Sequence, residues 1–161
     1  MSFEAHRITA ASKPEFYRQL CDQLRGLLAG ERDLIANAAN TAALLFQHMP
    51  DINWAGFYFL KDNDELVLGP FQGKPACVRI AKGKGVCGAA VERRATVRVE
   101  DVHAFPGHIA CDAASRSELV VPLIRDGRVT GVLDIDSPIP ARFDRDDQVG
   151  FEAVAAIFLA V

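Results

Sequence analysis

The sequence ELVVPLIRDGRVTGVLDID, residues 118–136, contains two apolar stretches of strand character on either side of the turn Arg125–Arg128. Valine, leucine and isoleucine dominate both stretches, Glu118–Ile124 and Val129–Ile135, as they do in many strands. The turn contains Asp-Gly, a dipeptide typical of tight hairpins. We therefore predict that these residues form an antiparallel hairpin.

Further strands and helices are expected on both sides of this hairpin. We expect strands at Asn53–Leu60, Glu65–Gly69, Cys77–Ile80 and Thr96–Val99, a short helix at Val86–Arg93, and long helices at Lys13–Ala29, Glu31–Met49 and Arg145–Ala160. The length suits one domain, with helices in residues 1–50 and the sheet core and final helix in residues 51–161. This order describes an α+β domain over residues 1–161, with helices packed on one face of a central antiparallel sheet.

Composition and charge argue against several classes of protein. The chain is 50% hydrophobic and its formal net charge is −3, so a general nucleic-acid binder, which needs a basic face, is not expected. The N-terminus has no apolar signal region and no later run could span a bilayer, so we expect a cytoplasmic protein without a membrane partner. In that reducing compartment the four cysteines are core thiols, metal ligands or redox catalysts.

A long loop, Asp101–Ser117, precedes the hairpin and is rich in Gly, Pro, His, Asp and Ser. Long irregular loops in compact domains usually bind or react with something, and the soft nucleophile of this loop is Cys111. Cys77 and Cys87 also lie at element ends, outside any strong apolar stripe. Cys87 falls in the first turn of the short helix, where the helix dipole would favour a thiolate. Cys21 is expected to be a packing thiol of the first helix.

Two kinds of chemistry fit the three loop cysteines. They could bind a metal together with His103 or His108, but the paired Cys-x-x-Cys spacing typical of zinc sites is missing from the sequence. They could instead form a redox set, in which one thiolate attacks an oxidised atom and becomes a sulfenic acid. A second cysteine then forms a disulfide with it, and an external dithiol restores both thiols. We favour the redox interpretation and expect no metal.

Acidic and aromatic residues are expected to complete a pocket. Glu118 begins one strand of the hairpin while Asp134 and Asp136 end the other, so the three carboxylates should lie side by side. Such carboxylates repel one another unless a cation, such as an amino-acid ammonium group or a metal, sits among them. The alternative is a polar rim at the sheet edge. Trp54 and Tyr58 share one strand face, either as core residues or as a pocket wall.

Several motifs resemble those of the free methionine-R-sulfoxide reductases, which are stand-alone GAF domains. The matching stretches are Asn53–Tyr58, Leu68–Gly73, Cys77–Ile80, Gly83–Gly88, Ile109–Asp112, Ser117–Glu118 and Leu133–Ser137. The resemblance implies a GAF-like central antiparallel sheet of six strands flanked by helices. It also implies reduction of free L-methionine-R-sulfoxide in defence against oxidative stress, with no bound cofactor. Thioredoxin, recharged by NADPH and thioredoxin reductase, would be the external reductant, and a homodimer could form.

The resemblance also implies a role for each site residue. Cys111 matches the thiol that attacks the sulfoxide, and Cys77 matches the resolving thiol. Cys87 matches a third family cysteine, for which the roles of attacker, resolver and relay stay open. The remaining matches are the acidic pocket residues Glu118, Asp134 and Asp136 and the aromatic wall of Trp54 and Tyr58.

A second function stays open beside catalysis. A GAF-type sensor would bind a small ligand and report to a partner without reacting. Sensors of that fold usually sit beside an output domain, and they need neither a resolving thiol nor a supply of thioredoxin. The cysteine triplet, Cys77, Cys87 and Cys111, therefore favours the enzyme over the sensor.

Overall fold

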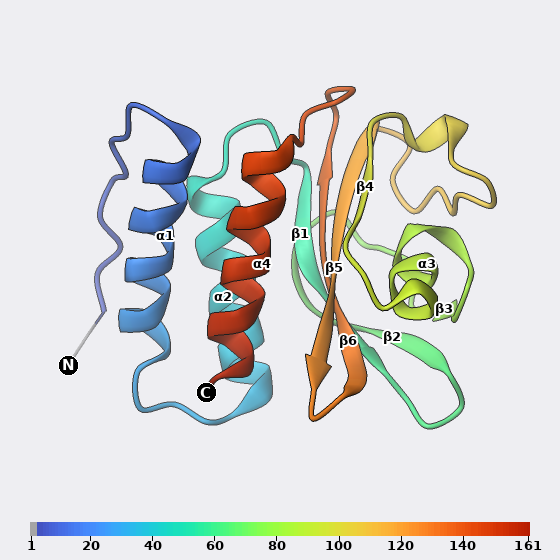
Figure 1. Ribbon diagram of the computed structural model, residues 1–161, viewed down its shortest axis with the longest axis horizontal. Helices are drawn as coiled ribbons and strands as arrows, with labels where there is room; N and C mark the ends of the chain where they lie inside the picture. Colours follow the sequence, from blue (N-terminus) through green and yellow to red (C-terminus); the bar gives the residue numbers. More distant parts are fainter. Residues whose placement is uncertain (1–2) are drawn as a thin grey trace.

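The computed structural model describes residues 3–161, which form four α-helices, a short 3-10 helix and a six-stranded sheet (Figure 1). The elements are α1 (Lys13–Leu28), α2 (Leu34–His48), β1 (Trp54–Leu60), β2 (Glu65–Gly73), β3 (Arg79–Ala81), α3 (Gly85–Arg93), β4 (Val97–Val99), η1 (Val102–Ala104), β5 (Ser117–Arg125), β6 (Arg128–Ser137) and α4 (Arg145–Leu159). All strand pairs are antiparallel, in the order β3-β2-β1-β6-β5-β4. The predicted hairpin is β5–β6, and the expected α+β class is confirmed.

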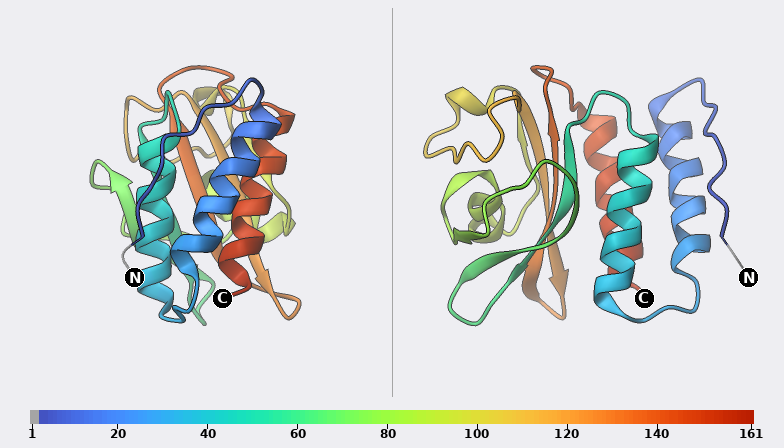
Figure 2. Two further views of the ribbon diagram at one scale, coloured as in Figure 1. Left: turned by 90° about the vertical axis from the view of Figure 1, so that its left-hand side faces the viewer. Right: turned by 180° about the vertical axis from the view of Figure 1, so that it is seen from behind.

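The sheet separates two apolar cores, because side chains alternate along each strand. Figures 1 and 2 show α1, α2 and α4 on one face, and α3 with the loop before β5 on the other. Phe57, Leu133 and Ile135 pack toward the three long helices, whereas Tyr58 and Val132 belong to the core on the α3 side. The expectation that the helices occupy one face is therefore correct for the long helices and wrong for α3.

The helix ends follow the capping signals of the sequence. The Ser12 hydroxyl accepts a hydrogen bond from the Glu15 amide at 3.3 Å, and Asp144 forms a capping box with Asp147 at the start of α4. Gly30, just beyond α1, has a φ of 82°, which glycine adopts without a steric penalty. These local contacts explain why the helix boundaries lie within three residues of the expected ones.

The strands near Cys77 differ from the sequence-based expectation. The expected end of β2 is Gly69, but the strand continues to Gly73. A register shift between Gly56 and Tyr58 of β1 accommodates Pro70, which has no backbone N–H to donate to the neighbouring strand. β3 begins at Arg79, so Cys77 lies in the connection before it rather than in a strand. Residues 74–76 of this connection line a cavity between the sheet and the loop before β5. Across residues 3–161, no helix has the length and apolar character that a bilayer crossing requires.

Candidate active site

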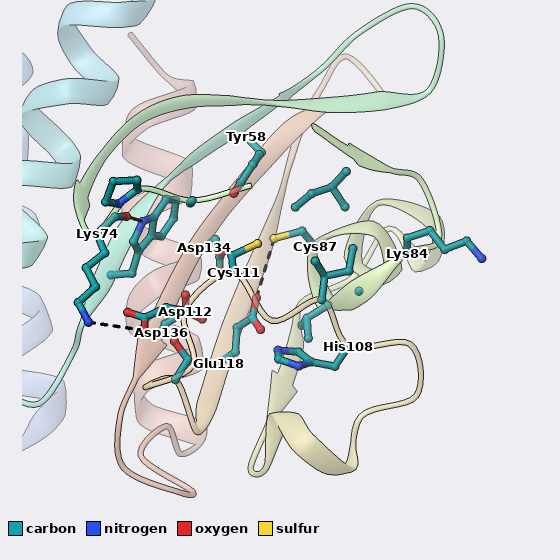
Figure 3. A pocket seen from close by; sticks show the side chains of 18 residues that line it. Tyr58, Lys74, Lys84, Cys87, His108, Cys111, Asp112, Glu118, Asp134 and Asp136 are labelled. Atoms are coloured by element: carbon teal, nitrogen blue, oxygen red, sulfur yellow. Dashed lines mark hydrogen bonds and ion pairs between the residues drawn. The ribbon is translucent and has the colours of Figure 1, made fainter. Parts of the chain in front are cut away.

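A cavity of about 40 Å³ lies between the α3 face of the sheet and the loop that precedes β5 (Figure 3). Its position explains why residues far apart in sequence meet, since β1, α3, the loop, β5 and β6 all contribute to the wall. Seven of the eight residues expected in the site line it directly: Trp54, Tyr58, Cys87, Cys111, Glu118, Asp134 and Asp136. The eighth, Cys77, is covalently joined to a lining residue.

Cys77 and Cys111 form a disulfide across 34 residues of sequence, with 5.5 Å between their Cα atoms. Cys77 comes from the connection between β2 and β3, and Cys111 from the loop before β5. Both residues are partly exposed. A metal site built from the three cysteines with His103 or His108 would need the sulfurs of Cys77 and Cys111 as ligands. These two sulfurs are bonded to each other, so the structure does not support the metal interpretation.

Cys87 is buried in the wall of the cavity, and its Sγ lies 3.9 Å from Oε1 of Glu118. Burial, followed by the nearby carboxylates of Asp134, Glu118 and Asp136, raises the pKa of this thiol well above its ordinary value. The expectation of a thiolate at the start of α3 is therefore wrong, because desolvation and negative neighbours outweigh the helix dipole. Cys87 also packs in the apolar core on the α3 side, which the sequence did not indicate.

The three carboxylates meet as the hairpin register requires. Glu118 lies opposite Asp136, and Asp134 lies one step further along the same face of β6. Glu118 and Asp134 are only 7% and 5% exposed. Burial raises the pKa of Asp134 to about 6, and burial together with Asp134 and Asp136 raises the pKa of Glu118 well above its usual range. Both shifts favour the protonated acid over the carboxylate, so these groups retain a proton at a higher pH than exposed carboxyl groups do.

One oxygen of this cluster is not engaged within residues 3–161. Oδ1 of Asp134 is buried and has no hydrogen-bond partner there. Ligand atoms of Cys87, Glu118 and Asp134 lie within 4.8 Å of one another, so these three residues could hold a cation. A buried acceptor without a donor is costly, and a bound ammonium group would satisfy it.

Trp54 and Tyr58 belong to the apolar core on the α3 side and also line the cavity. The core and the pocket-wall interpretations of these aromatics are therefore compatible. Their rings stack at 5.9 Å, and each side chain is at most 3% exposed. Their polar atoms hold the segment that carries Cys77, because the Trp54 indole donates to the Lys74 carbonyl at 3.1 Å and the Tyr58 hydroxyl donates to the Cys77 carbonyl at 2.9 Å. The aromatic wall therefore fixes the position of the segment around Cys77.

Asp112 was not singled out from the sequence as a site residue, although it directly follows Cys111. Its carboxylate accepts hydrogen bonds from the Ala114 amide at 2.9 Å and from Nδ2 of Asn53 at 3.1 Å. Nδ2 of Asn53 also donates to the Ser115 hydroxyl at 3.0 Å. The Ala114 hydrogen bond chiefly lowers the pKa of Asp112, so its carboxylate is charged and fixes the loop beside Cys111.

Two histidines lie in the same loop and were expected only as metal ligands. His108 lines the cavity, and its ring lies 6.3 Å from that of His103. Partial burial, with a smaller contribution from His103, lowers the pKa of His108. The imidazole of His108 is therefore neutral at physiological pH.

Comparisons with known proteins identify the GAF fold, and several of the relatives are named as free methionine-R-sulfoxide reductases. The family model of the GAF domain matches residues 14–160. The free methionine-R-sulfoxide reductase of Escherichia coli (strain K12) is 56% identical over 145 residues, which cover 90% of this chain and 87% of that protein.

Two solved structures are similar over nearly their whole length. The X-ray structure of free methionine-R-sulfoxide reductase from Neisseria meningitidis in complex with its substrate has a TM-score of 0.94 and 46% sequence identity, covering 99% of this chain and 95% of that chain. A structure described as a GAF sensor protein from Burkholderia vietnamiensis has a TM-score of 0.88 and 61% identity, covering 92% and 94%.

Proposed function

Since the chain belongs to the GAF domain family, and within it to the free methionine-R-sulfoxide reductases, we propose that its cavity reduces free L-methionine-R-sulfoxide to L-methionine. The protein is an oxidoreductase, and the resemblance found in its sequence motifs is confirmed. The observation that carries the function is the Cys77–Cys111 disulfide beside buried acids. A disulfide of this kind is the product expected when one thiol reduces a sulfoxide and a second thiol resolves it.

The reaction divides into three balanced steps. The Cys111 sulfur attacks the sulfoxide sulfur, and the sulfoxide oxygen passes to Cys111, which releases methionine and leaves a sulfenic acid. The Cys77 thiol then attacks that sulfenic sulfur, so that an S–S bond forms and water leaves. Two electrons and two protons from an external dithiol finally restore both thiols. The 5.5 Å between the two Cα atoms supports the second step, because it suits a disulfide.

We assign acid catalysis to the carboxylate cluster. A sulfoxide oxygen leaves more easily when it is protonated, and Glu118 is a buried acid whose pKa is raised chiefly by its burial. Asp134 and Asp136 are the candidates for holding the substrate ammonium group, while Trp54 and Tyr58 would contact the methyl-sulfur end. Cys87 sits beside Glu118 as a neutral thiol, so we assign it no part in the attack on the sulfoxide.

The external reductant and the setting of the reaction complete the proposal. Thioredoxin, kept reduced by NADPH and thioredoxin reductase, fits because Cys77 and Cys111 are partly exposed and no bound cofactor is needed for a thiol cycle. Such a cycle suits the cytoplasm, where residues 1–161 would act as one domain. The exposed Leu34 and Ile35 of α2 support contact between two copies in a homodimer.

A small-ligand sensor is the second candidate, supported by the similarity to the Burkholderia vietnamiensis protein. One assay separates the two functions. The purified protein is mixed with reduced thioredoxin and either the R or the S isomer of free methionine sulfoxide, and thioredoxin oxidation is followed. We expect turnover with the R isomer only, and unchanged turnover in Cys21→Ser, whose thiol lies in the helical core. Absence of turnover with the R isomer, or equal turnover with the S isomer, would refute the reductase.

A further inference from the structure

Lys74 is a cation at the mouth of the cavity that neither the sequence motifs nor the reaction steps use. Its side chain lines the cavity and is 74% exposed. Its Nζ atom lies 4.0 Å from Oδ1 of Asp112, too far for a hydrogen bond, and it donates none to any residue between 3 and 161. The three N–H groups of this ammonium are therefore free to bind a ligand.

The charges of the cavity make Lys74 the cation best placed for this. Four carboxylates line the wall, at Asp112, Glu118, Asp134 and Asp136, against two lysines. Figure 3 shows the Lys74 ammonium directed toward Asp112 and Asp136, whereas the side chain of Lys84 extends away from the other labelled groups. Asp112 keeps the Lys74 ammonium near the cavity, because its own charge is fixed by Asn53 and Ala114.

The substrate of the proposed function carries two charges on one carbon atom. If its ammonium group binds among the carboxylates at Asp136, its α-carboxylate must lie beside that group. A carboxylate next to several acids is repelled unless a cation or N–H donors face it. Methionine sulfoxide within a protein chain has neither charge, so recognition of both would select the free amino acid.

We propose that Lys74 forms the subsite for the α-carboxylate of the free amino acid and thereby determines the preference for free over peptide-bound substrate. The inference rests on the proposed function. A carboxylate bound by Lys74 would also orient the substrate. The head group would lie at the end of the cavity near Lys74 and Asp136, and the sulfoxide near Cys111 and Glu118. Lys74 is a binding residue in this scheme and takes no part in the transfer of oxygen.

The test compares two substrates that differ only in the carboxylate, L-methionine-R-sulfoxide and its carboxamide. Rates are measured at pH 6.5, where the amino groups of both are protonated, with dithiothreitol as the reductant so that a partner protein plays no part. We expect the unmodified protein to prefer the acid by about ten- to a hundredfold in kcat/KM, the usual effect of one charge-assisted hydrogen bond. Lys74→Met should lose this preference through a higher KM for the acid.

Two further variants exclude a merely structural effect. Lys82→Met removes an exposed lysine that pairs with Asp64 at a similarly long 3.8 Å but does not line the cavity, and it should keep the preference. Asp112→Asn removes the negative charge that attracts the Lys74 ammonium group. If Lys74→Met and Asp112→Asn both lower kcat/KM equally for acid and amide, Lys74 acts only on the loop and the proposal is wrong.

The remaining outcomes separate this inference from the function on which it rests. If Lys74→Met still prefers the acid as strongly as the unmodified protein does, the carboxylate binds elsewhere and the subsite is refuted. If the unmodified protein reduces neither compound, the proposed reductase activity itself fails. Reduction of both compounds with equal efficiency by the unmodified protein would also overturn the subsite while leaving the reductase intact.

Discussion

Two serine substitutions distinguish the attacking thiol from the resolving thiol. Cys111→Ser should abolish reduction of the sulfoxide and leave no sulfenic acid, because no other thiol takes its place. Cys77→Ser should release one methionine per protein and then stop, since the sulfenic acid of Cys111 lacks its partner. Both are measured in a single turnover by methionine release and sulfenic-acid trapping. Normal cycling of Cys77→Ser with thioredoxin would transfer the resolving role to Cys87.

The Tyr58 hydroxyl should affect the resolving step more than the binding of substrate. It donates to the Cys77 carbonyl, so Tyr58→Phe keeps the ring but frees the segment that carries Cys77. We expect disulfide formation to slow by about two- to tenfold, the usual effect of one neutral hydrogen bond. Rapid-quench analysis of the disulfide measures this rate. Tyr17→Phe is the matched control, because its hydroxyl binds Asp147 far from the cavity. Equal slowing in both variants would disprove the positioning role.

Protonation of Asp134 should make stability depend on pH. Burial raises its pKa to about 6 in the folded protein, above the ordinary value of 3.8. The folded state therefore binds the proton more tightly, and the resulting stability is complete below pH 4 and lost as the pH rises through 6. The loss is on the order of 2–3 kcal/mol. Denaturant unfolding at pH 5 and pH 7.5 should show a decrease that is smaller in Asp134→Asn. If the free energy of unfolding falls between these two pH values as much in Asp134→Asn as in the unmodified protein, this assignment is wrong.

Contact between α1 and α4 depends on one glycine. A Cβ atom at Gly150 of α4 would overlap the ring of Tyr17, whereas one at Gly26 of α1 would make only ordinary contacts with Phe3. Gly150→Ala should therefore destabilise the fold by about 1–3 kcal/mol through overpacking. Gly26→Ala should instead stabilise it by up to about 1 kcal/mol, because alanine favours the helix. Denaturant unfolding gives both values, and equal effects would show that α1 and α4 adjust freely.

Local sequence patterns predicted most elements of this fold. The helices that begin at Lys13 and Arg145 and the β5–β6 hairpin were predicted, because short-range contacts such as the caps at Ser12 and Asp144 determine them. The meeting of Glu118 with Asp134 and Asp136 also followed from hairpin register alone. The placement of α3 was not predicted, since its small residues give no clear indication of which face of the sheet they cover.

The protonation of Cys87 and the contacts of Lys74 and Asp112 needed the three-dimensional structure. The pKa of Cys87 depends chiefly on burial in a second core and on carboxylates from two distant strands, neither of which its helix position reveals. Lys74 and Asp112 are 38 positions apart and meet because the disulfide segments of Cys77 and Cys111 converge. Long-range convergence of loops was therefore the information that the sequence lacked.

At the scale of the molecule, the disulfide ties two connections together beside the cavity. These connections come from opposite ends of the sheet order, and the cavity, whose wall includes residues of β1 and β6, has a volume of about 40 Å³. That volume holds a few water molecules, whereas sites for small ligands usually measure roughly 300–1,000 Å³. We therefore expect the oxidised form to bind a free amino acid poorly. On this expectation the disulfide is reduced before each binding event, which would order the catalytic cycle.

This order can be measured without turnover. In the double variant Cys77→Ser, Cys111→Ser the disulfide cannot form and the sulfoxide cannot react, so binding alone is observed. We expect calorimetry to detect L-methionine-R-sulfoxide binding to this variant at least tenfold more tightly than to the oxidised protein, because only the variant can open its loops. Oxidised Cys21→Ser serves as the control, since its disulfide is intact and its altered thiol is in the helical core. Equal affinity for the double variant and the oxidised protein would mean that the loops open while the disulfide holds, and the substrate would then enter by a route independent of the redox state.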